Sequence, residues 1–533
     1  MTNHDVDVLV VGSGASGAAF TWSLSEAGIN VMCLEQGGWL NPATDYTTSD
    51  IDWELHRQTD FHPSPNFRRL KSDYPVNDTN SPIAPLMYNA VGGSTIHWSA
   101  HFPRLKPSDF RVKSLDGVAD DWPITYKDLE PYFDANDKIM GVAGLNGDPG
   151  YPVKSPRQTP AIGLGKLGDK IVSGFDKLDW HWWPADSAIN TVEYDGRLGC
   201  NNCGPCDLGC PRKAKSSTDV TYWPKAIKNG ARLITNARVR EVTVNDKGEA
   251  DGVIYYDKDG NEIEQKAKIV VLACNGIGTP RILLNSKSPA FSDGLANSSG
   301  LVGKNLMFHP YARVTGIFDE DLEGNKGPTP LSIMSSQFYE TDLSRGFVRG
   351  YSYQVRRSMS PLEVAFSGQI TWGSDHHKEF SRMLNRTVGF VVIGEDLPEL
   401  HNEVILDSEI KDGDGIPAPK VNYTLSENSR KMMDHGIGTS KQVMEAAGAI
   451  DVFYDPLIRN AGWHLMGTAR MGNNINDSVV NKYGEAHDVK NLYVIDGSVF
   501  VTAGGVNPTS TIQAIALHAA DHIKKNARHI NTQ

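Results

Sequence analysis

The sequence contains no uninterrupted apolar stretch that is long enough to cross a membrane. A transmembrane helix needs roughly 18 or more consecutive apolar residues, and no segment approaches that number. The first residues, MTNHDVDVLVVGSG, have no basic segment, twin arginine or cleavable apolar stretch of the kind that directs export. We therefore expect a cytoplasmic protein without a transmembrane segment, while export as a folded complex with a signal-bearing partner stays open.

Positive charge and cysteine are both scarce. The 52 Lys and Arg residues are outnumbered by 64 Asp and Glu residues, which gives a net charge of −12. Proteins that bind nucleic acids present a basic face to the phosphates, so we expect no nucleic-acid partner. Six cysteines in 533 residues are too few for a disulfide scaffold. The absence of H-E-x-x-H and of a serine-nucleophile elbow argues against a metalloprotease or an esterase.

The N-terminal region carries the pattern of a nucleotide-binding strand, turn and helix. Residues 6–11 form a continuous apolar run, which is typical of a strand buried on both faces of a parallel sheet. The run enters G-x-G-x-x-G at Gly12, Gly14 and Gly17. In such a turn the first glycine permits the tight bend, the second lets a pyrophosphate approach the backbone, and the third brings the helix close to the strand. The free N–H groups at the start of the helix then favour the pyrophosphate.

A second apolar strand, residues 30–34, leads directly to Glu35. This acid follows Gly17 by 18 residues. Such folds place the carboxylate that binds a ribose hydroxyl at a distance of about 20 residues. Strand, glycine turn, helix and acid together predict dinucleotide binding, but the pattern alone does not separate NAD from FAD.

Four of the six cysteines lie within eleven residues, in the run CNNCGPCDLGC. Their spacing matches that of bacterial ferredoxins, in which the fourth cysteine binds a different cluster from the first three. These four are Cys200, Cys203, Cys206 and Cys210. The other two, Cys33 and Cys274, fall in expected strand regions and are poorly placed to complete a cluster. An iron–sulfur cluster, a zinc site and free thiols all stay open, with free thiols as our first interpretation.

Four further stretches carry a family resemblance when they are taken together with the N-terminal pattern. They are NAVGGSTIHWSAHFPRLKPSDF at 89–110, DWPITYKDLEPYF at 121–133, VVLACNGIGTPRILLNS at 270–286, and WHLMGTARMG at 463–472 followed by NLYVIDGSVFVTAGGVNPTSTIQAIALHAAD at 491–521. In this order they resemble the glucose–methanol–choline (GMC) family of FAD-dependent oxidoreductases. The resemblance runs from residue 6 to about residue 524.

The resemblance implies an α/β (α+β) fold of two domains: a Rossmann-like FAD-binding domain and an inserted substrate domain built on a large antiparallel sheet with helices. The FAD-binding domain would comprise residues 1–110, 200–315 and 455–533. The substrate domain, which would cap the site, would comprise residues 111–199 and 316–454. Independently of the resemblance, residues 238–272 alternate as strands do and break at KDGN, which predicts a hairpin.

The resemblance also assigns cofactor contacts to individual positions. The ADP part of FAD would be held by Gly12, Gly14, Ser16, Gly17 and Glu35, and the adenine edge by the backbone of Val239. Close to the flavin ring would lie Gly92, Gly93, Ser94, Asn507 and Pro508, with Asp496 at the ribityl or pyrophosphate region.

Oxidation of an alcohol removes a proton from the hydroxyl group and a hydride from the carbon, so the protein must supply a base. His464 matches the family's active-site histidine, and a neutral imidazole suits proton transfer near pH 7. Asn507 matches a second position, which is His in some members and Asn in many sugar-oxidising ones. Its amide does not act as a base at neutral pH but orients the substrate oxygen. We therefore predict that His464 is the base and that Asn507 positions the substrate.

Three neighbouring residues have alternatives that stay open. STIHW resembles a segment of pyranose oxidases whose histidine is joined covalently to the flavin, so His97 would either form that bond or pack beside the dimethylbenzene edge. His101 and Arg104 follow closely in the sequence and would either line the substrate pocket or serve the structure.

The substrate class is again implied by resemblance. Asn507, STIHW and CGPCDLGCPRKAKSS together resemble bacterial sugar-oxidising members: pyranose oxidases, glycoside 3-oxidases and 3-dehydrogenases, and the flavin subunits of gluconate and fructose dehydrogenases. The first hypothesis is oxidation of a secondary hydroxyl of a pyranose or glycoside, at C3 or C2, with electrons passing to O2 or another acceptor. DWHWWPAD at 179–186 and SYQVRR at 352–357 would supply stacking surfaces and hydroxyl partners, with packing or contact with a partner subunit as the alternative for the tryptophans.

Two other functions stay open. One is the catalytic flavin subunit of a multi-subunit sugar dehydrogenase, which would have a small partner subunit and relay electrons through an iron–sulfur cluster at Cys200–Cys210. The other is a flavin-fold protein that performs no net oxidation.

Overall fold

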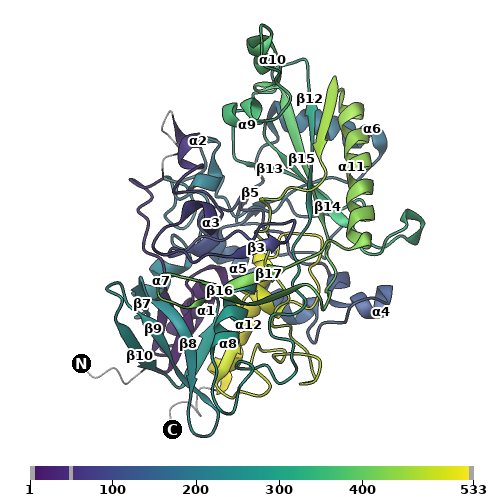
Figure 1. Cartoon of the computed structure of the whole chain (residues 1–533). Coiled ribbons are helices and arrows are strands. Elements are labelled where there is room, and N and C mark those ends of the chain that lie inside the picture. The colour runs from purple at the N-terminus through teal and green to yellow at the C-terminus, as the bar shows by residue number, and fades with distance from the viewer. Residues whose placement is uncertain (1–5, 47, 49–51, 527–533) are drawn as a thin grey trace.

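The apolar run near the N-terminus forms the central strand of a five-stranded parallel sheet (Figure 1). The computed structural model describes residues 6–46, 48 and 52–526, so the outermost residues of the expected FAD-binding segments lie outside the described residues. In the order β19-β11-β1-β2-β7, the strands are Leu492–Val494, Ile269–Leu272, Val8–Val11, Val31–Glu35 and Arg232–Thr235. Every residue of the first four is buried, as strands covered on both faces require.

Helices cover one face of this sheet and a smaller sheet covers the other. The helices are α1 (Ala15–Glu26), α7 (Tyr222–Lys228) and α12 (Thr509–Asn526), with α5 (Tyr126–Met140) packed on α12. The smaller sheet is antiparallel and consists of β8 (Arg238–Val244), β9 (Ala250–Tyr256) and β10 (Glu262–Lys266). The hairpin predicted at KDGN is the connection between β9 and β10. We call this assembly the parallel-sheet unit.

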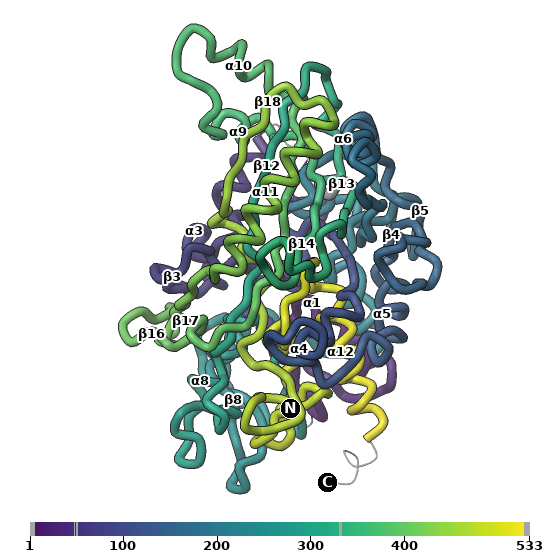
Figure 2. Tube along the Cα trace, turned by 90° about the vertical axis from the view of Figure 1, so that its right-hand side faces the viewer, coloured from purple at the N-terminus to yellow at the C-terminus, as the bar shows by residue number. Residues whose placement is uncertain are grey.

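A second unit is built on a six-stranded sheet whose neighbouring strands all run antiparallel. In the order β18-β12-β15-β14-β13-β6, the strands are Asp451–Asp455, Tyr311–Ile317, Thr387–Gly394, Tyr351–Arg356, Pro330–Ser335 and Trp183–Pro184. Helices α6 (Gly165–Leu178) and α11 (Glu427–Ala447) pack on one face of it (Figures 1 and 2). We call this the antiparallel-sheet unit. The expected combination of a Rossmann-like fold with a large antiparallel sheet is confirmed.

The bounds of α11 follow from local sequence. Ser426 precedes the helix, and its side-chain oxygen accepts a hydrogen bond from the backbone N–H of Ser429. Gly448 ends the helix with a φ of 92°, a conformation that glycine adopts without steric cost. The opposite face of the sheet is thereby left to face the parallel-sheet unit.

The third sheet combines segments from the two expected domains. It contains β3 (Asn77–Asn80), β16 (Glu403–Lys411) and β17 (Pro417–Asn422). The β16–β17 hairpin belongs to the expected substrate domain, yet it packs on α8 (Asn275–Asn285) of the parallel-sheet unit. Buried Asp412 between these strands lies 2.7 Å from Arg281 of α8, and this ion pair holds the hairpin there.

The remaining elements are short. They are α2 (Trp53–His56), α3 (Pro65–Arg68), α4 (Val112–Asp116), α9 (Pro361–Ala365), α10 (His376–Met383), β4 (Ala143–Gly144) and β5 (Thr159–Pro160), and the 3₁₀ turns η1 (Gly93–Ile96), η2 (Pro107–Phe110), η3 (Cys206–Leu208), η4 (Leu343–Arg345) and η5 (Gly497–Val499). Both ribbon views show α9 and α10 projecting at the end of the molecule opposite β8 and α8 (Figures 1 and 2).

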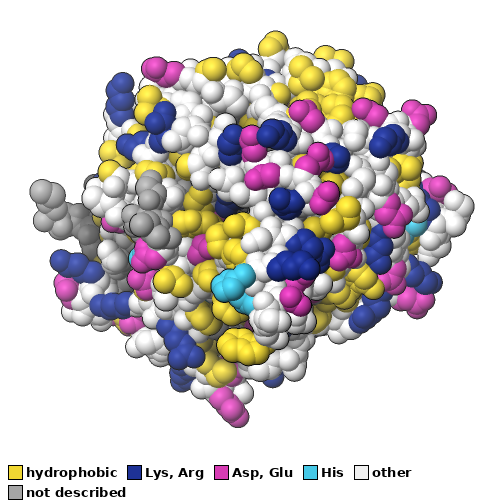
Figure 3. All heavy atoms as spheres, turned by 90° about the horizontal axis from the view of Figure 1, so that it is seen from above, with side chains coloured by type: hydrophobic (Ala, Val, Ile, Leu, Met, Phe, Trp, Pro, Cys, Tyr) yellow, Lys and Arg dark blue, Asp and Glu magenta, His cyan; other side chains and the backbone are white. Residues whose placement is uncertain are grey.

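The face in Figure 3 intersperses Lys and Arg with Asp and Glu and presents no continuous basic field. Among the described residues, no helix combines the length and apolar character that spanning a membrane requires.

Candidate active site

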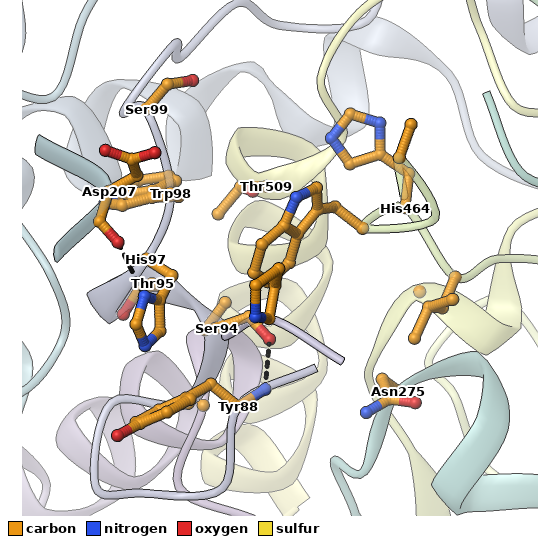
Figure 4. A pocket seen from close by; sticks show the side chains of 18 of the residues that line it. Tyr88, Ser94, Thr95, His97, Trp98, Ser99, Asp207, Asn275, His464 and Thr509 are labelled. Carbon is orange, nitrogen blue, oxygen red and sulfur yellow. Dashed lines mark hydrogen bonds between the residues drawn. The ribbon is translucent and has the colours of Figure 1, made fainter. Parts of the chain in front are cut away.

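A cavity of about 820 Å³ lies between the two units. Its walls come from the glycine turn, β2, the segment 88–101 and the start of α12 on one side, and from β12, β14 and β15 on the other. Figure 4 shows His464 and His97 on opposite sides of this cavity. We describe first the end formed by the glycine turn and then the end at His464.

The glycine turn leaves backbone exposed to the cavity. Gly12 has a φ of 98°, and a Cβ atom there would lie 2.5 Å from the carbonyl oxygen of Ala273. A Cβ atom on Gly17 would lie 1.9 Å from the carbonyl oxygen of Gly12, so glycine is what lets α1 approach the turn. Gly14 begins α1 without a side-chain cap, and Gly14 and Ser16 both line the cavity. The first N–H groups of α1 are therefore available to an anion such as a pyrophosphate.

Two buried carboxylates line the same end. Glu35 accepts hydrogen bonds from the N–H and Oγ of Ser13, at 3.0 and 2.7 Å, and from the N–H of Gly37, at 2.8 Å. Asp496 accepts from the N–H of Ser498 at 2.8 Å and from the N–H of Asn275 at 3.1 Å. Burial raises the pKa of both carboxyls. The backbone and carboxylate groups together fit a dinucleotide.

Other residues that were expected to contact the cofactor lie at or behind the cavity wall. Val239, Gly93, Ser94, Asn507 and Pro508 line it. Gly92 and Gly17 do not line it and act through the backbone: Gly92 has a φ of 100°, and a Cβ there would lie 3.2 Å from the Cβ of Asp219. Gly93 approaches Gly14 so closely that its own Cβ would lie 3.0 Å from the Cα of Gly14.

His97 is held in one tautomer. Its Nδ1 lies 2.6 Å from the carbonyl oxygen of Asp207, which only accepts, so Nδ1 donates (Figure 4). Burial lowers the pKa of His97 to about 3, so the ring is neutral and Nε2 carries a lone pair. Nε2 is buried and has no hydrogen-bond partner among the described residues. Because His97 lines the cavity, this atom is a free acceptor at the edge of the cofactor end.

At the other end, a chain of hydrogen bonds fixes the proton positions on His464. The Nε2 of His309 lies 2.6 Å from the carbonyl oxygen of Gly504 and must donate to it. The Nδ1 of a neutral His309 is then an acceptor, and it lies 2.7 Å from the Nδ1 of His464. His464 therefore donates from Nδ1 and keeps a lone pair on Nε2. The hydroxyl of Tyr311, 3.2 Å from the same Nδ1, supports this ring from β12.

Both imidazoles are neutral at physiological pH. Burial lowers the pKa of His309 to about 4. Burial, reinforced by His309, lowers the pKa of His464 well below its usual value. A neutral ring with a free Nε2 is the form that accepts a proton from a hydroxyl group.

Asn507 is oriented by Gln354. The Nε2 of Gln354, on β14, donates a hydrogen bond to the Oδ1 of Asn507. This leaves the Nδ2 of Asn507 to donate a long hydrogen bond of 3.4 Å to the Nε2 of His464. A substrate hydroxyl that replaces this bond and contacts both atoms would give its proton to His464 and accept a hydrogen bond from Asn507.

The antiparallel sheet supplies a polar wall opposite the glycine turn. Tyr311 and Arg313 of β12 and Gln354 and Arg356 of β14 line the cavity, together with Val391 of β15 between them. Val391 is paired with both Arg313 and Gln354 in the sheet register. Side chains two residues apart on a strand point to the same face, which explains why these positions share one wall.

Several sequence-predicted substrate residues lie away from the cavity. His101 lines it, but Arg104 does not: the buried guanidinium lies 2.6 Å from Asp134 and 2.5 Å from Asp137 on α5. The tryptophans of DWHWWPAD are also absent from the lining. Trp180 and Trp182 pack on the hydrophobic cluster beneath α6 and α11, and the indole of Trp183 donates to the carbonyl of Leu145 at 2.8 Å.

The cysteine run lies beside the cavity without forming a metal site. Cys203 is exposed and Cys206 is buried, and the Sγ of Cys206 accepts from the N–H of Thr329 at 3.4 Å. Over the described residues, no three or more His, Cys, Asp or Glu side chains are arranged to hold a metal ion. The four thiols thus do not fit an iron–sulfur cluster or zinc, and we derive no electron transfer through them. The run contacts the cavity instead through Asp207 and its hydrogen bond to His97.

Sequence reasoning missed His309, Tyr311 and Gln354. His309 and Tyr311 flank Pro310 at the start of β12, where the FHPY segment has a histidine in an otherwise apolar run. Gln354 lies inside SYQVRR, for which the sequence predicts contact with substrate hydroxyls and not the orientation of Asn507.

Three sequence models of known families match parts of this chain. The sequence model described as GMC oxidoreductase matches at residues 187–311 and again, for the C-terminal part, at 398–516. A model described as NAD(P)-binding Rossmann-like domain matches residues 10–73.

Two of the similar proteins align over nearly their whole length at more than 30% identity. The chain is 42% identical to 2-methyl-1,2-propanediol dehydrogenase of Mycolicibacterium austroafricanum, over 97% of this chain and 95% of that protein. It is 31% identical to the fructose dehydrogenase large subunit of Gluconobacter japonicus, over 97% of each. A third, 6'''-hydroxyparomomycin C oxidase of Streptomyces lividus, is 28% identical over 96% of this chain and 90% of that protein.

Solved structures share the fold at low sequence identity. A pyridoxine 4-oxidase from Mesorbium loti superposes with a TM-score of 0.64 at 16% identity, covering 97% of this chain and 99% of that one. A formate oxidase of Aspergillus oryzae RIB40, studied for its FAD modification, gives 0.64 at 16% identity, with coverage of 98% and 99%.

Proposed function

This chain belongs to the GMC oxidoreductase family and is an oxidoreductase, and from that premise we propose that it oxidises a secondary hydroxyl of a pyranose sugar or glycoside, at C3 or C2, to a keto-sugar. The observation that carries the proposal is the neutral His464, whose unprotonated Nε2 accepts a 3.4 Å hydrogen bond from the amide of Asn507 inside a polar-walled cavity. The relatives are named as a dehydrogenase of 2-methyl-1,2-propanediol, a subunit of a fructose dehydrogenase and an oxidase of 6'''-hydroxyparomomycin C, and these names support a hydroxyl-bearing carbon as the site of oxidation.

FAD is the cofactor that we propose. The exposed backbone at Gly12 and Gly14, the free start of α1 and the carboxylates of Glu35 and Asp496 form a cradle that fits its dinucleotide part. When bound, FAD supplies the acceptor for the hydride that leaves the alcohol carbon. We propose that His97 packs against its ring system through the unpartnered Nε2 edge.

The protein's own contribution is to hold the hydroxyl group and remove its proton. The Nε2 of His464 accepts that proton as the C–H bond is broken. The positive charge that forms on His464 is stabilised through Nδ1, which donates to His309. Asn507 donates from Nδ2 to the substrate oxygen and so stabilises the negative charge that develops there.

A polyhydroxylated ring suits this cavity better than a small diol. Hydrogen-bonding side chains on Tyr311, Arg313, Gln354 and Arg356 extend along two strands of the wall, beyond the two groups that bind the reacting oxygen. A ring with several hydroxyls reaches more of the donors and acceptors of this row than a small diol does. Among the relatives, the fructose dehydrogenase subunit and the aminoglycoside oxidases are named for sugar-type substrates.

For the electron acceptor we propose O2 or another diffusible oxidant. The fructose dehydrogenase subunit and the gluconate 2-dehydrogenase flavoprotein, at 31% and 24% identity, suggest a partner subunit as a second candidate. Purification of the chain alone and measurement of steady-state turnover with O2 and with a soluble quinone separates them. Turnover by the isolated chain supports the first candidate.

The test of substrate class uses anaerobic single turnover. The FAD-loaded protein is mixed with glucose, methyl glucoside, glucuronate and 2-methyl-1,2-propanediol, and bleaching of the flavin absorbance is followed. We expect at least one sugar to bleach it faster than the diol does, with a keto-sugar identified by NMR. Bleaching by the diol alone, or by none of the four, would overturn the proposal.

A further inference from the structure

Arg356 is a guanidinium without a partner in the wall of the active-site cavity. It ends β14, two residues beyond Gln354, and both side chains line the cavity. Among the side chains that the structure describes, Arg356 makes no hydrogen bond and no ion pair. Burial lowers the pKa of the Arg356 guanidinium, because the surrounding protein removes part of its hydration.

The acidic groups near Arg356 are already engaged. Asp207 lies 2.7 Å from Arg57. Glu363 lies 3.8 Å from Arg57 and accepts hydrogen bonds from the N–H and Oγ of Ser360 at 3.0 and 3.2 Å. The nearby Arg313 is paired with Asp455 at 3.5 Å. These three carboxylates equal the three arginines in number and attract Arg356 through space, but none of them lies within ion-pair distance of its guanidinium.

The sheet gives Arg356 room to reach into the cavity. Its neighbour in the register of β15 is Gly389, which has no side chain, and the Cβ that another residue would carry there would lie 3.7 Å from the Cβ of Arg356. Two rows along, on the same face of the sheet, Gln354 is paired with Val391, and Gln354 orients Asn507. Arg356 is therefore the next cavity-facing residue of β14 after the one that orients Asn507.

We propose that Arg356 is a specificity-determining residue and that it binds a carboxylate on the substrate, so that the preferred substrate is a sugar acid, such as a uronate or an aldonate, rather than a neutral sugar. The inference rests on the proposed function and narrows it. A desolvated guanidinium that lacks a protein partner is stabilised by an anionic ligand, and the planar fork matches both oxygens of a carboxylate. Neutral hydroxyl groups form weaker, uncharged hydrogen bonds with the same fork.

Two independent measurements test this inference. The first compares kcat/KM for methyl glucuronoside and methyl glucoside, which differ only in a carboxylate at C6. We expect the acid to be preferred by roughly 10- to 100-fold, the usual worth of a hydrogen bond to a charged group. Arg356→Met should remove that preference by lowering kcat/KM for the acid alone, and Arg356→Lys should retain part of it.

The second measurement needs no oxidation. Calorimetric titration of the FAD-loaded protein compares tetrahydropyran-2-carboxylate with its carboxamide, neither of which has a hydroxyl group to oxidise. We expect the wild type to bind the carboxylate at least about tenfold more tightly than the carboxamide. Arg356→Met should bind the two compounds equally. If the wild type prefers the carboxylate but no sugar reduces the flavin, the result supports the carboxylate site and contradicts the proposed oxidation.

The adjacent arginine provides the control. Arg357 donates to the carbonyl oxygen of Asn325 at 3.1 Å and does not line the active-site cavity. Arg357→Met removes the same charge from the next position and should leave both preferences unchanged. Equal binding of carboxylate and carboxamide by the wild type would overturn the inference, as would equal losses for acid and neutral substrates in Arg356→Met.

Discussion

The Nδ1 atoms of His309 and His464 lie 2.7 Å apart, and a single proton occupies the space between them. Since the other nitrogen of His309 must donate to the carbonyl of Gly504, that proton belongs to His464. His464 therefore presents an unprotonated Nε2 to the cavity without any charged residue to fix its tautomer. A neutral second imidazole does here what a carboxylate does in other histidine bases.

Replacement of the base tests the chemical step. His464→Ala should slow reduction of the flavin by a saturating substrate by roughly 10²–10⁴-fold, the usual contribution of a general base. Stopped-flow absorbance under anaerobic conditions measures the rate, and an unchanged FAD content shows that the cavity is intact. A variant that is reduced as fast as the wild type would remove His464 from the mechanism.

The wild-type pH profile follows from the direction of the pKa shift. The base must be unprotonated, so activity falls only as pH decreases through the pKa of His464. Burial and His309 lower that pKa well below the usual value. We expect kcat/KM to stay flat from about pH 6.5 upward to pH 8, with the acid limb below the ordinary histidine value of about 6.5. An acid limb above pH 7 would contradict a buried, neutral base.

His309 acts on the substrate only through His464, so its replacement should change kcat more than KM. His309→Ala removes the acceptor of the Nδ1 proton and frees His464 to adopt the wrong tautomer. We expect kcat to fall by about 10- to 100-fold, below the 10²–10⁴-fold worth of the base itself. His309→Gln, whose amide oxygen accepts the same proton, should recover part of the rate. Equal damage by Ala and Gln would favour a purely structural role.

Asn507→Asp changes charge at almost constant shape. The introduced carboxylate would lie where Nδ2 now faces His464 at 3.4 Å. A negative charge favours the protonated imidazole, so the pKa of His464 should rise and the acid limb of kcat/KM should move to higher pH. Asn507→Ala, which lacks the charge, should lose rate without that movement. A profile that does not move in the Asp variant would show that position 507 is not adjacent to the base.

The sequence alone predicts the glycine turn but not the contact between His309 and His464. Three glycines, Gly12, Gly14 and Gly17, follow one strand within a few residues. Their spacing alone predicts the tight turn and the close approach of the helix that the structure shows. His309, just before β12, meets His464, in the segment between β18 and β19, although the two positions are 155 residues apart. No periodicity or local motif encodes such a pairing, so it becomes visible only in the folded chain.

Proximity in sequence was a poor guide to the substrate wall. Arg104 follows His101 by three residues, yet it turns inward to the carboxylates of Asp134 and Asp137. The sequence marks Arg356 only as part of SYQVRR, because the absence of a partner is a property of the fold and not of the segment. Which arginine is paired and which is free depends on acids that come from distant parts of the chain.

Replacement of Arg349 tests how much its ion pairs stabilise the junction between the two units. Its guanidinium lies 2.6 Å from Asp109, 2.9 Å from Asp116 and 2.9 Å from Glu395. All but Asp116 are buried almost completely. Arg349→Met should lower the free energy of unfolding by about 3–5 kcal/mol, because it leaves buried carboxylates without a countercharge. Denaturant unfolding of the wild type and the variant measures the difference.

The pH dependence of that difference separates lost charge from lost packing. Burial already raises the pKa of Asp109 and Glu395, and Arg349 opposes the rise. Without Arg349 both folded-state pKa values rise further above their unfolded values, so the folded variant is favoured at low pH and loses stability as pH increases through them. The deficit of Arg349→Met should therefore be larger at pH 8 than at pH 6, and Glu395→Gln in the same chain should reduce it. A deficit independent of pH would mean that Arg349 stabilises the junction by packing alone.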